Sequence, residues 1–497
     1  MSRDGRATLW AFAGAGAILA LPALLVRRPP VLDLPQLLEQ VVLLGRVLGG
    51  RDPELELHAA GPNRLGYLLV LLARAVGGDA WGPRLAVALA IAVWVAAVAW
   101  ICVRLERPLA AGLLATTLAY SSLLYAGFFN FLAGVVPLAF WAVELRRDPA
   151  RSPAWAMALR SLAGALLLYL AHALWLVVGG FAVATWVLLF RFSRREALAR
   201  AAGVAPVVAL ALAWSGELAA AGWQSNVRML VAPLDRLTSP RFRTTVFWGG
   251  LEGWVEVALF GALVLWLAGS GVAAWRARGR GADSFLLLFG ALALLLVFLA
   301  PGKMDHTVLF AWRWGPFAAL ALLLGVPPPP LPARAATACA AAVVVLFALA
   351  TARAWHAFER DELRGFEAAL AAVPEGGRVV GLDFVRRSPR FKVQPFFQMS
   401  AYAAVERRAE TSFSFAGVAS SLVTYRELPR TRSFTPSLES YPFWVRAGDL
   451  EFFDVVLFHG DARASAWLAE RLPGLIPVAG DGRWWLLARP GRAAEAK

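Results

Sequence analysis

Six carboxylate or imidazole side chains stand close together in one polar segment of an otherwise apolar chain. The segment spans residues 27–80 and holds Asp33, Glu39, Asp52, Glu54, Glu56 and His58. It follows the first long apolar run, and apolar runs dominate the chain after it up to about residue 354. A carboxylate held at a membrane boundary can take a proton from a reacting hydroxyl group. We therefore expect residues 27–80 to be the catalytic loop of a membrane enzyme, on the outer face.

Each of these side chains also has a simpler interpretation. Asp33 precedes Leu34-Pro35, which is the pattern of a helix N-cap followed by an early proline. Glu39 fits the solvent face of the helix that would follow. The other acidic residues fit a solvated loop, and a lone loop histidine such as His58 is rarely a metal ligand or an acid–base group. The cap and the catalytic role of Asp33 are compatible with each other.

A second group of charged residues lies late in the chain. If a helix begins near Lys303, then Lys303, His306 and Arg313 fall on one stripe, because they follow offsets of three and seven. An arginine several residues into a membrane span is costly without an anionic or carbonyl partner. The stripe suits a lipid-linked phosphate at headgroup level, which arginine can hold with two parallel hydrogen bonds. The alternative is an ion pair of Arg313 with Asp305 or Glu256.

Further polar residues are expected at the outer ends of apolar runs. Asn130 and His172 occupy such positions, where a polar group either bonds helices together or lines a cavity. Glu252 and Glu256 are one helical turn apart and share a face. We expect a cavity to be lined by the following residues: Gln36, His58, Asn130, His172, Glu252 and Glu256.

Composition places the chain among multi-pass membrane proteins. Of its 497 residues 59% are hydrophobic, and the mean hydropathy is +0.59. The net charge of +15 comes from arginine in the connectors between apolar runs, so we expect no nucleic acid partner. Both cysteines lie in apolar runs, and no disulfide is expected. The chain has no Walker-type phosphate loop and no Cys/His cluster with zinc spacing, so no metal site is assigned.

About eleven apolar runs are long enough to be membrane helices. They are residues 9–26, 81–103, 109–125, 128–145, 159–171, 173–190, 198–214, 251–275, 285–300, 308–326 and 335–355. Within the polar loop, residues 34–48 and 64–76 read as two amphipathic helices that lie on the membrane rather than cross it.

The connectors between these runs alternate in charge. The connectors near residues 104–107, 146–151, 191–195, 276–280 and 334 carry arginine, whereas those near 126–127, 172 and 301–307 have almost none. This asymmetry predicts that the first set is cytoplasmic. Residues 27–80 and the tail then share the periplasmic face of a bacterial inner membrane.

The tail differs in composition from the rest of the chain. Short β-type runs at residues 378–382, 455–458 and 484–487 alternate with helical patterns at 361–373 and 464–472. We therefore expect two domains: a polytopic α-helical membrane domain over residues 1–355, and a periplasmic α/β domain over residues 356–497.

The order of these parts resembles the integral-membrane glycosyltransferases of the GT-C superfamily, especially bacterial members that use polyprenyl-phosphate sugars. The matching residues are Asp33-Leu34-Pro35 in the first loop, the run from Pro62 to Leu69 that leads into the next span, and Phe128 to Gly134. The architectural resemblance covers roughly residues 1–355. This family would have a second acid or a histidine two to four residues after the loop aspartate, whereas here Gln36 and Leu37 stand there.

The resemblance implies transfer of a sugar from a polyprenyl-phosphate donor to a glycan, lipid or protein acceptor of the cell envelope. Asp33 would then be the catalytic base, and Arg313, Lys303 and His306 would bind the donor phosphate. A divalent cation is the one cofactor left open. Two other classes remain: a non-catalytic envelope-assembly protein, and a transporter or flippase for a lipid-linked glycan. Against a transporter, the chain shows no repeated halves and few charges inside its apolar runs.

Overall fold

The computed structural model describes residues 3–220, 227–228, 235–236, 247–251, 253–276, 281–304, 307–427 and 434–493. Eight of the described helical segments are long and apolar enough to cross a membrane. They are α1 (Arg3–Leu25), α3 (Leu65–Arg104), the segment Leu109–Ala126 made of α4, η1 and α5, α8 (Ala154–Ala171), α9 (Ala173–Phe190), α10 (Arg194–Ala220), α13 (Trp254–Arg276) and α16 (Ala333–Ala357).

The other three expected spans are shorter helices. They are the segment Phe129–Glu144 made of α6 (Phe129–Leu132) and α7 (Val135–Glu144), then α14 (Ser284–Leu299), and α15 (Gly315–Gly325). The predicted helix over residues 308–326 is therefore wrong in its first part. Lys303–Met304 (β3) and Thr307–Val308 (β4) pair as antiparallel strands, β2 (Val227–Arg228) pairs with β3, and a 3-10 turn, η3 (Trp312–Trp314), precedes α15.

The polar loop contains the two predicted helices, with one difference. Helix α2 has the expected bounds, Leu34–Leu48. The second helix begins at Leu65 and runs into the following span as α3, interrupted only by a kink at Gly78, where φ is +59°. A residue with a side chain rarely adopts that backbone conformation, so glycine permits the kink. The label α3 therefore covers two helices that meet at Gly78, and the predicted helix over residues 64–76 is the first of them; that it lies on the membrane stays a prediction.

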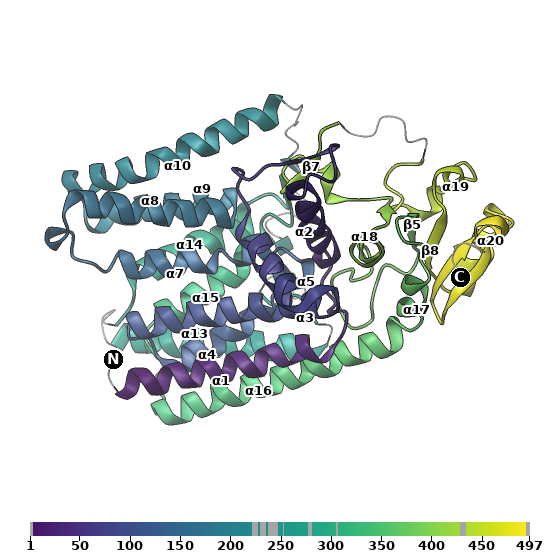
Figure 1. Ribbon diagram of the computed structural model, residues 1–497. Helices are drawn as coiled ribbons and strands as arrows, with labels where there is room; N and C mark the ends of the chain where they lie inside the picture. The colour runs from purple at the N-terminus through teal and green to yellow at the C-terminus, as the bar shows by residue number, and fades with distance from the viewer. Residues whose placement is uncertain are drawn as a thin grey trace.

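The arginine-rich connectors gather at one end of the helical bundle. Arg107 donates hydrogen bonds to the carbonyls of Gly281 and Val326, and Arg146 forms an ion pair with Asp283. Figure 1 shows α1 and α16 running from the end that carries the N-terminus to the end that carries the C-terminal sheet. The predicted grouping is confirmed for the connectors near residues 104–107, 146–151 and 191–195, whereas residues 277–280 of the next connector lie outside the described residues. Which face is cytoplasmic stays a prediction.

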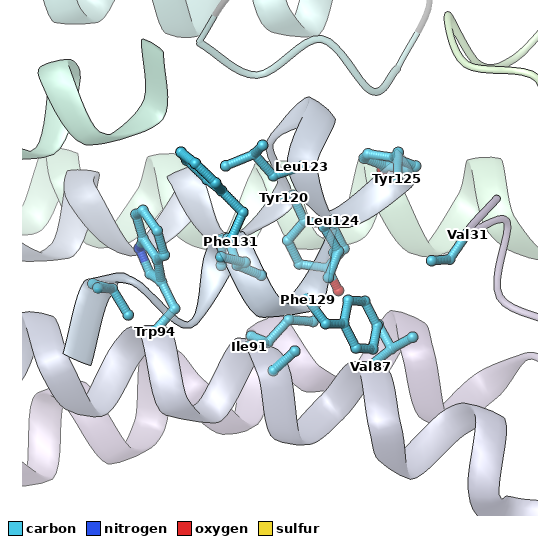
Figure 2. Close-up of a cluster of buried hydrophobic side chains, with 14 of the residues drawn as sticks. Val31, Val87, Ile91, Trp94, Tyr120, Leu123, Leu124, Tyr125, Phe129 and Phe131 are labelled. Atoms are coloured by element: carbon cyan, nitrogen blue, oxygen red, sulfur yellow. The ribbon is translucent and has the colours of Figure 1, made fainter. Parts of the chain in front are cut away.

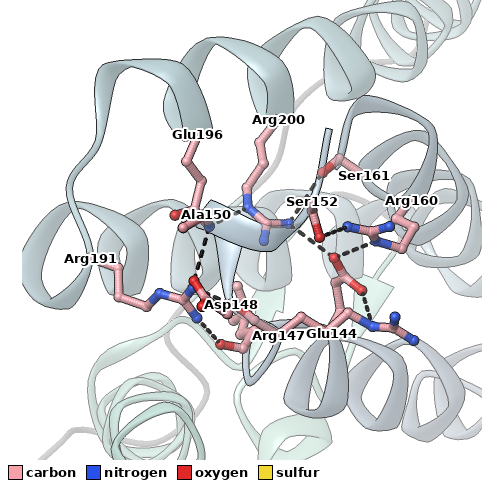
Figure 3. A network of polar contacts seen from close by, with 11 residues as sticks. Glu144, Arg147, Asp148, Ala150, Ser152, Arg160, Ser161, Arg191, Glu196 and Arg200 are labelled. Atoms are coloured by element: carbon pink, nitrogen blue, oxygen red, sulfur yellow. Dashed lines mark hydrogen bonds and ion pairs between the residues drawn. The ribbon is translucent and has the colours of Figure 1, made fainter. Parts of the chain in front are cut away.

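Glu144 anchors a further ion network at this arginine-rich end (Figure 3). Its carboxylate lies 2.8 Å from Arg160 Nε and 3.0 Å from Arg147 Nε, and it is 3% exposed. Arg200 joins α10 to the network, because its Nη1 lies 3.8 Å from Glu144, while its Nε pairs with Glu196 of the same helix at 2.9 Å. Buried charges need such pairing, because an isolated charge away from water is strongly disfavoured. The network fixes the ends of α7, α8 and α10 relative to one another.

The described part of the tail contains a five-stranded mixed sheet with the order β6-β5-β8-β10-β9. The three predicted strands are present as β5 (Arg378–Asp383), β8 (Val455–His459) and β10 (Trp484–Ala488). β5 pairs in parallel with β6 (Glu410–Thr411) and with β8, whereas β10 is antiparallel to β8 and to β9 (Ile476–Asp481). Its helices are α17 (Phe366–Ala371), α18 (Ala401–Arg407), α19 (Asp449–Phe452), α20 (Ala462–Arg471) and α21 (Pro490–Ala493).

The polar loop and the tail are packed against each other. Arg28, which is 2% exposed in its side chain, pairs with Glu367 at 2.7 Å and with Glu406 at 2.6 Å. Its guanidinium also lies 4.2 Å from the ring centroid of Tyr402. These contacts join the end of α1 to α17 and α18, and so hold the start of the loop beside the tail.

Two further contacts extend this docking along the loop. The Gln40 side chain donates to the carbonyl of Val423 and accepts from the amide of the same residue, at 3.1 and 2.9 Å. Strand β1 (Leu55–Leu57) pairs antiparallel with β7 (Val423–Tyr425). The tail therefore forms part of the structure that surrounds the loop.

We predict that Arg28→Met destabilises the fold by about 3 kcal/mol, because it removes a buried guanidinium that pairs with two carboxylates and lies against the Tyr402 ring. Arg27→Met is the matched control. Arg27 also pairs with Glu367, at 3.0 Å, but it is 47% exposed, and an exposed pair contributes about 0–1 kcal/mol. Thermal unfolding of both variants in detergent measures the difference. Equal losses of stability would contradict a special role of the buried guanidinium.

Candidate active site

Asp33 lies at the turn between α1 and α2, on the end of the bundle that carries the C-terminal sheet. The backbone amides of Leu32 and Asp33 donate to the carbonyls of Tyr125 and Ala126, at 2.8 and 3.3 Å. Gly127 packs directly against it: a Cβ at this glycine would lie 2.8 Å from the Asp33 amide nitrogen. The turn that ends α5 (Ser122–Ala126) therefore fixes the position of Asp33.

A hydrophobic cluster supports this turn from below. Figure 2 shows Val87 and Ile91 of α3 beside Phe129, and Tyr125 belongs to the same cluster; Tyr125 and Phe129 flank the turn in sequence. Val31, two residues before Asp33, belongs to the same cluster. All five side chains are buried, so the backbone around Asp33 has little room to move.

Asp33 precedes the first residue of α2, but its side chain makes no capping hydrogen bond. Its backbone also lies at φ −87° and ψ 0°, outside the extended conformation usual for a cap. In contrast, Asp283 and Asp461 accept capping bonds from Leu286 and Ala464 at the starts of α14 and α20. The simpler interpretation of Asp33 as a cap is therefore wrong, and its carboxylate is available for another role.

Arg313 is the positively charged residue whose electrostatic field acts on the Asp33 carboxyl group. Arg313 lies in η3, is 6% exposed, and its guanidinium carbon is 3.8 Å from the ring centroid of Phe128. Asp33 and Arg313 interact electrostatically. Residues 33, 128 and 313 are far apart in sequence, and the fold brings a carboxylate, an aromatic ring and a guanidinium into one centre.

The environment of Asp33 changes its proton affinity. Burial raises the pKa of its carboxyl group to about 7, and the Arg313 guanidinium opposes that rise. A carboxyl group with a pKa near 7 exchanges protons at neutral pH, which is the condition for an efficient general base. The geometry thus gives Asp33 both a counter-charge and a suitable proton affinity.

Tyr67 and Arg64 line the same region from the start of α3. Tyr67 is buried and interacts electrostatically with both Asp33 and Arg64. Arg64 donates through one terminal nitrogen to the His58 carbonyl, while its buried Nε and Nη1 have no hydrogen-bond partner among the described residues. Unsatisfied guanidinium donors of this kind can hold an oxyanion. In the sequence, Arg64 and Tyr67 belong to the run from Pro62 to Leu69 that resembles the GT-C superfamily, but neither was expected to be a site residue.

His172 and Asn130 adjoin this centre, mainly as structural residues. His172 interacts electrostatically with Arg313, and its Nδ1 accepts the amide proton of Leu174 at the start of α9. That bond places the proton of a neutral ring on Nε2. Asn130 Oδ1 accepts from the amide of Gly66 at 2.7 Å and so ties α6 to α3.

Three other predicted cavity residues have other partners. Gln36 bridges to the tail: its Nε2 donates to Gln398 Oε1 and to the carbonyl of Phe413, at 3.2 and 3.1 Å. His58 Nε2 is 2.8 Å from Thr424 Oγ1. Glu256 forms an ion pair with Lys392 at 2.6 Å.

The predicted cationic stripe is also absent from the described structure. Lys303 lies in a strand and Arg313 in a 3-10 turn, so no helix aligns them. The proposed pairing of Arg313 with Glu256 is wrong, because Glu256 pairs with Lys392 and accepts the amides of Gly250 and Leu251. Asp305, His306 and Glu252 lie outside the described residues.

A second polar pair lies in the tail but lacks room for a substrate. His459 Nδ1 is 2.8 Å from Asp383 Oδ1, at the adjacent ends of β5 and β8, and its ring stacks on Trp484. The cavity beside the pair is about 10 Å³, which is no more than a single water molecule needs. Within the described ranges, no three His, Cys, Asp or Glu residues group together as metal ligands would. The centre around Asp33 is therefore the stronger candidate site.

No family model and no curated protein matches the chain. The structure of a mycobacterial arabinofuranosyltransferase, AftD, is similar over 98% of this chain, with 17% sequence identity and a TM-score of 0.48. The chain spans 42% of the length of AftD.

We predict that Gly127→Ala perturbs the site through crowding as well as backbone strain. Gly127 has φ +80° and contacts Asp33, whereas Gly474 has φ +95° and open space around its Cα. Gly474→Ala therefore measures the left-handed strain alone, about 1–2 kcal/mol. Gly127→Ala should lose a further 1–3 kcal/mol or so from overpacking. Equal unfolding temperatures for the two variants would contradict the close contact with Asp33.

Proposed function

We propose that this protein is a membrane glycosyltransferase that moves a sugar from a polyprenyl-phosphate donor to an envelope acceptor at the periplasmic face. The observation that carries the proposal is the buried centre in which Asp33, not used as a helix cap, faces the charge of Arg313. Its position also supports the proposal, because it lies at one end of a bundle of long apolar helices. A donor with an isoprenoid chain in the bilayer would present its phosphate at that level.

The chemistry assigns each group a step. An acceptor hydroxyl oxygen attacks the anomeric carbon of the donor sugar, while the bond from that carbon to the phosphate oxygen breaks. The hydroxyl proton passes to the Asp33 carboxylate, and the polyprenyl phosphate leaves with the bonding electron pair. Arg313 and the unsatisfied donors of Arg64 then stabilise the charge that develops on the phosphate. No step requires a metal-bound group.

A reconstituted assay separates this proposal from its alternatives. The purified protein is placed in proteoliposomes with radiolabelled polyprenyl-phosphate sugars and a membrane extract as the source of acceptor. Transfer of label to acceptor supports the enzyme. Movement of labelled lipid between leaflets without transfer would indicate a flippase, and neither activity would favour a non-catalytic assembly protein.

We predict that Asp33→Asn lowers the turnover number at least about 10²-fold, because an amide cannot accept the hydroxyl proton. In the wild type, the rate should fall about tenfold per pH unit as the pH drops below the Asp33 pKa of about 7, because protonation removes the base. Asp461→Asn is the control, since Asp461 is a true cap and Asn also caps helices. Full activity of the Asp33 variant, with the wild-type pH profile, would exclude Asp33 as the base.

We predict that Arg313→Ala raises the Michaelis constant for the polyprenyl-phosphate donor at least about tenfold while changing that for the acceptor little, because a charged hydrogen bond to phosphate is lost. Arg64→Ala should act in the same direction. Arg353→Ala removes an exposed arginine of α16 and serves as the control. If Arg313→Ala weakened both substrates equally, the phosphate-binding role would be contradicted. Arg313→Lys should restore only part of the loss, because lysine lacks the bidentate geometry.

A further inference from the structure

A large polar cavity lies beside α2, outside the centre around Asp33. It has a volume of about 700 Å³ and is enclosed by α2, the loop up to Leu55, and tail residues near α18, β6 and β7. This volume is in the range of cavities that bind small organic ligands. None of the roles assigned above to the Asp33 centre uses it.

One buried carboxyl group in the cavity wall has an oxygen without a partner among the described residues. Glu39 is 4% exposed, and its Oε2 has no hydrogen-bond partner among the described residues. The Ser414 side chain hydrogen-bonds to the Glu39 carboxyl group and also to Tyr425. A buried acceptor left without a partner is costly, so the site is built to meet a donor from a ligand. Burial raises the pKa of Glu39 to about 8, and a protonated carboxyl group can both donate and accept.

The charged groups of the wall are nearly balanced, because with Glu39 protonated at neutral pH three carboxylates stand against four guanidinium groups. Four acidic residues line the cavity: Glu39, Asp52, Glu54 and Glu410. Four arginines line it as well: Arg46, Arg51, Arg74 and Arg408. A site for a polyanion such as a nucleic acid or a polyphosphate would carry an excess of positive charge. The balance here favours a ligand without net charge.

The wall offers both hydrogen-bond donors and acceptors. Carboxylates accept hydrogen bonds, guanidinium groups donate them, and the Tyr425 phenol can do either. Each hydroxyl of a sugar is both a donor and an acceptor, so a ligand rich in hydroxyl groups satisfies both kinds of wall residue at once. Tyr425 also brings an aromatic ring to the cavity, which can cover the apolar face of a sugar.

We propose that this cavity binds an uncharged oligosaccharide, as the part of the acceptor that precedes the reacting hydroxyl. The inference rests on the proposed function for the identity of the acceptor. Glu39 follows Asp33 by six residues, so α2 separates the two by about 9 Å along its axis at 1.5 Å per residue. An acceptor seated in the cavity would have sugars within a short distance of the catalytic centre.

The test measures glycan binding without requiring transfer. Full-length protein in lipid nanodiscs is applied to an array of uncharged di- to pentasaccharides, with sulfated and carboxylated glycans as charge controls. We expect retention of a subset of uncharged glycans, and at least tenfold weaker binding by Glu39→Leu. Because this substitution removes a buried group with an unsatisfied oxygen, the unfolding temperature of the Glu39→Leu variant should not fall sharply. Glu470→Leu makes the same chemical change at an exposed position of α20 and should bind as the wild type does.

A second variant distinguishes loss of binding from misfolding. Arg51 is exposed at the cavity rim, so Arg51→Ala cannot unfold the core and should weaken binding several-fold. Asp33→Asn should bind the same glycans as the wild type. Glycan binding that depends on Glu39, in a protein without transfer activity, would leave this site standing and remove the proposed function. Retention of charged glycans only, no retention at all, or unchanged binding by Glu39→Leu and Arg51→Ala would overturn the inference.

Discussion

The buried guanidinium of Arg28 is the interaction on which the arrangement of the candidate site depends. Its charge lies away from water and is matched by Glu367 and Glu406 of the tail. Breaking one partner of such a group leaves a charge that the interior cannot solvate. The segment after α1 is therefore held against the tail at Arg28, and Asp33 follows Arg28 by only five residues. Hydrogen bonds from the side-chain amides of Gln36 and Gln40 hold α2 against the tail in the same way.

The packing of the first loop against the tail determines which of its polar residues are available to the site. Gln36 stands where the resemblance to the GT-C superfamily would place a second acid or a histidine, and the structure uses it as a bridge to Gln398 and Phe413. The loop thus offers one carboxylate to the Asp33 centre, balanced by Arg313. A single base with an arginine partner suits a proton transfer joined to the departure of a phosphate, and this is the chemistry proposed for the protein.

Part of this arrangement could be predicted from the sequence. The apolar runs identified the helices, because a twenty-residue apolar stretch has few other uses, and α2 was predicted with its observed bounds. The β-type runs of the tail identified β5, β8 and β10. The arginine connectors were correctly grouped, since Arg107 and Arg146 contact the neighbouring connectors.

The site could be predicted only in part. Asp33, His172 and Arg313 were named from their positions, but the helical stripe of Lys303 and Arg313 failed because β3 and β4 replace the start of that helix. Arg64 and Tyr67 were missed as site residues because their role depends on the packing of α3 against α6, the helix that follows the turn at Gly127. A glycine at φ +80° against Asp33 leaves no periodic signal in a sequence. Long-range contacts of this kind follow from the tertiary structure.

The most direct test of the account is a cryo-electron microscopy structure of the protein in nanodiscs with a non-hydrolysable polyprenyl-phosphate sugar analogue. The account predicts density for the phosphate within hydrogen-bond distance of Arg313 or Arg64, and the anomeric carbon beside the Asp33 carboxylate. A donor seated elsewhere in the bundle, with Asp33 and Arg313 in contact only with protein, would contradict it.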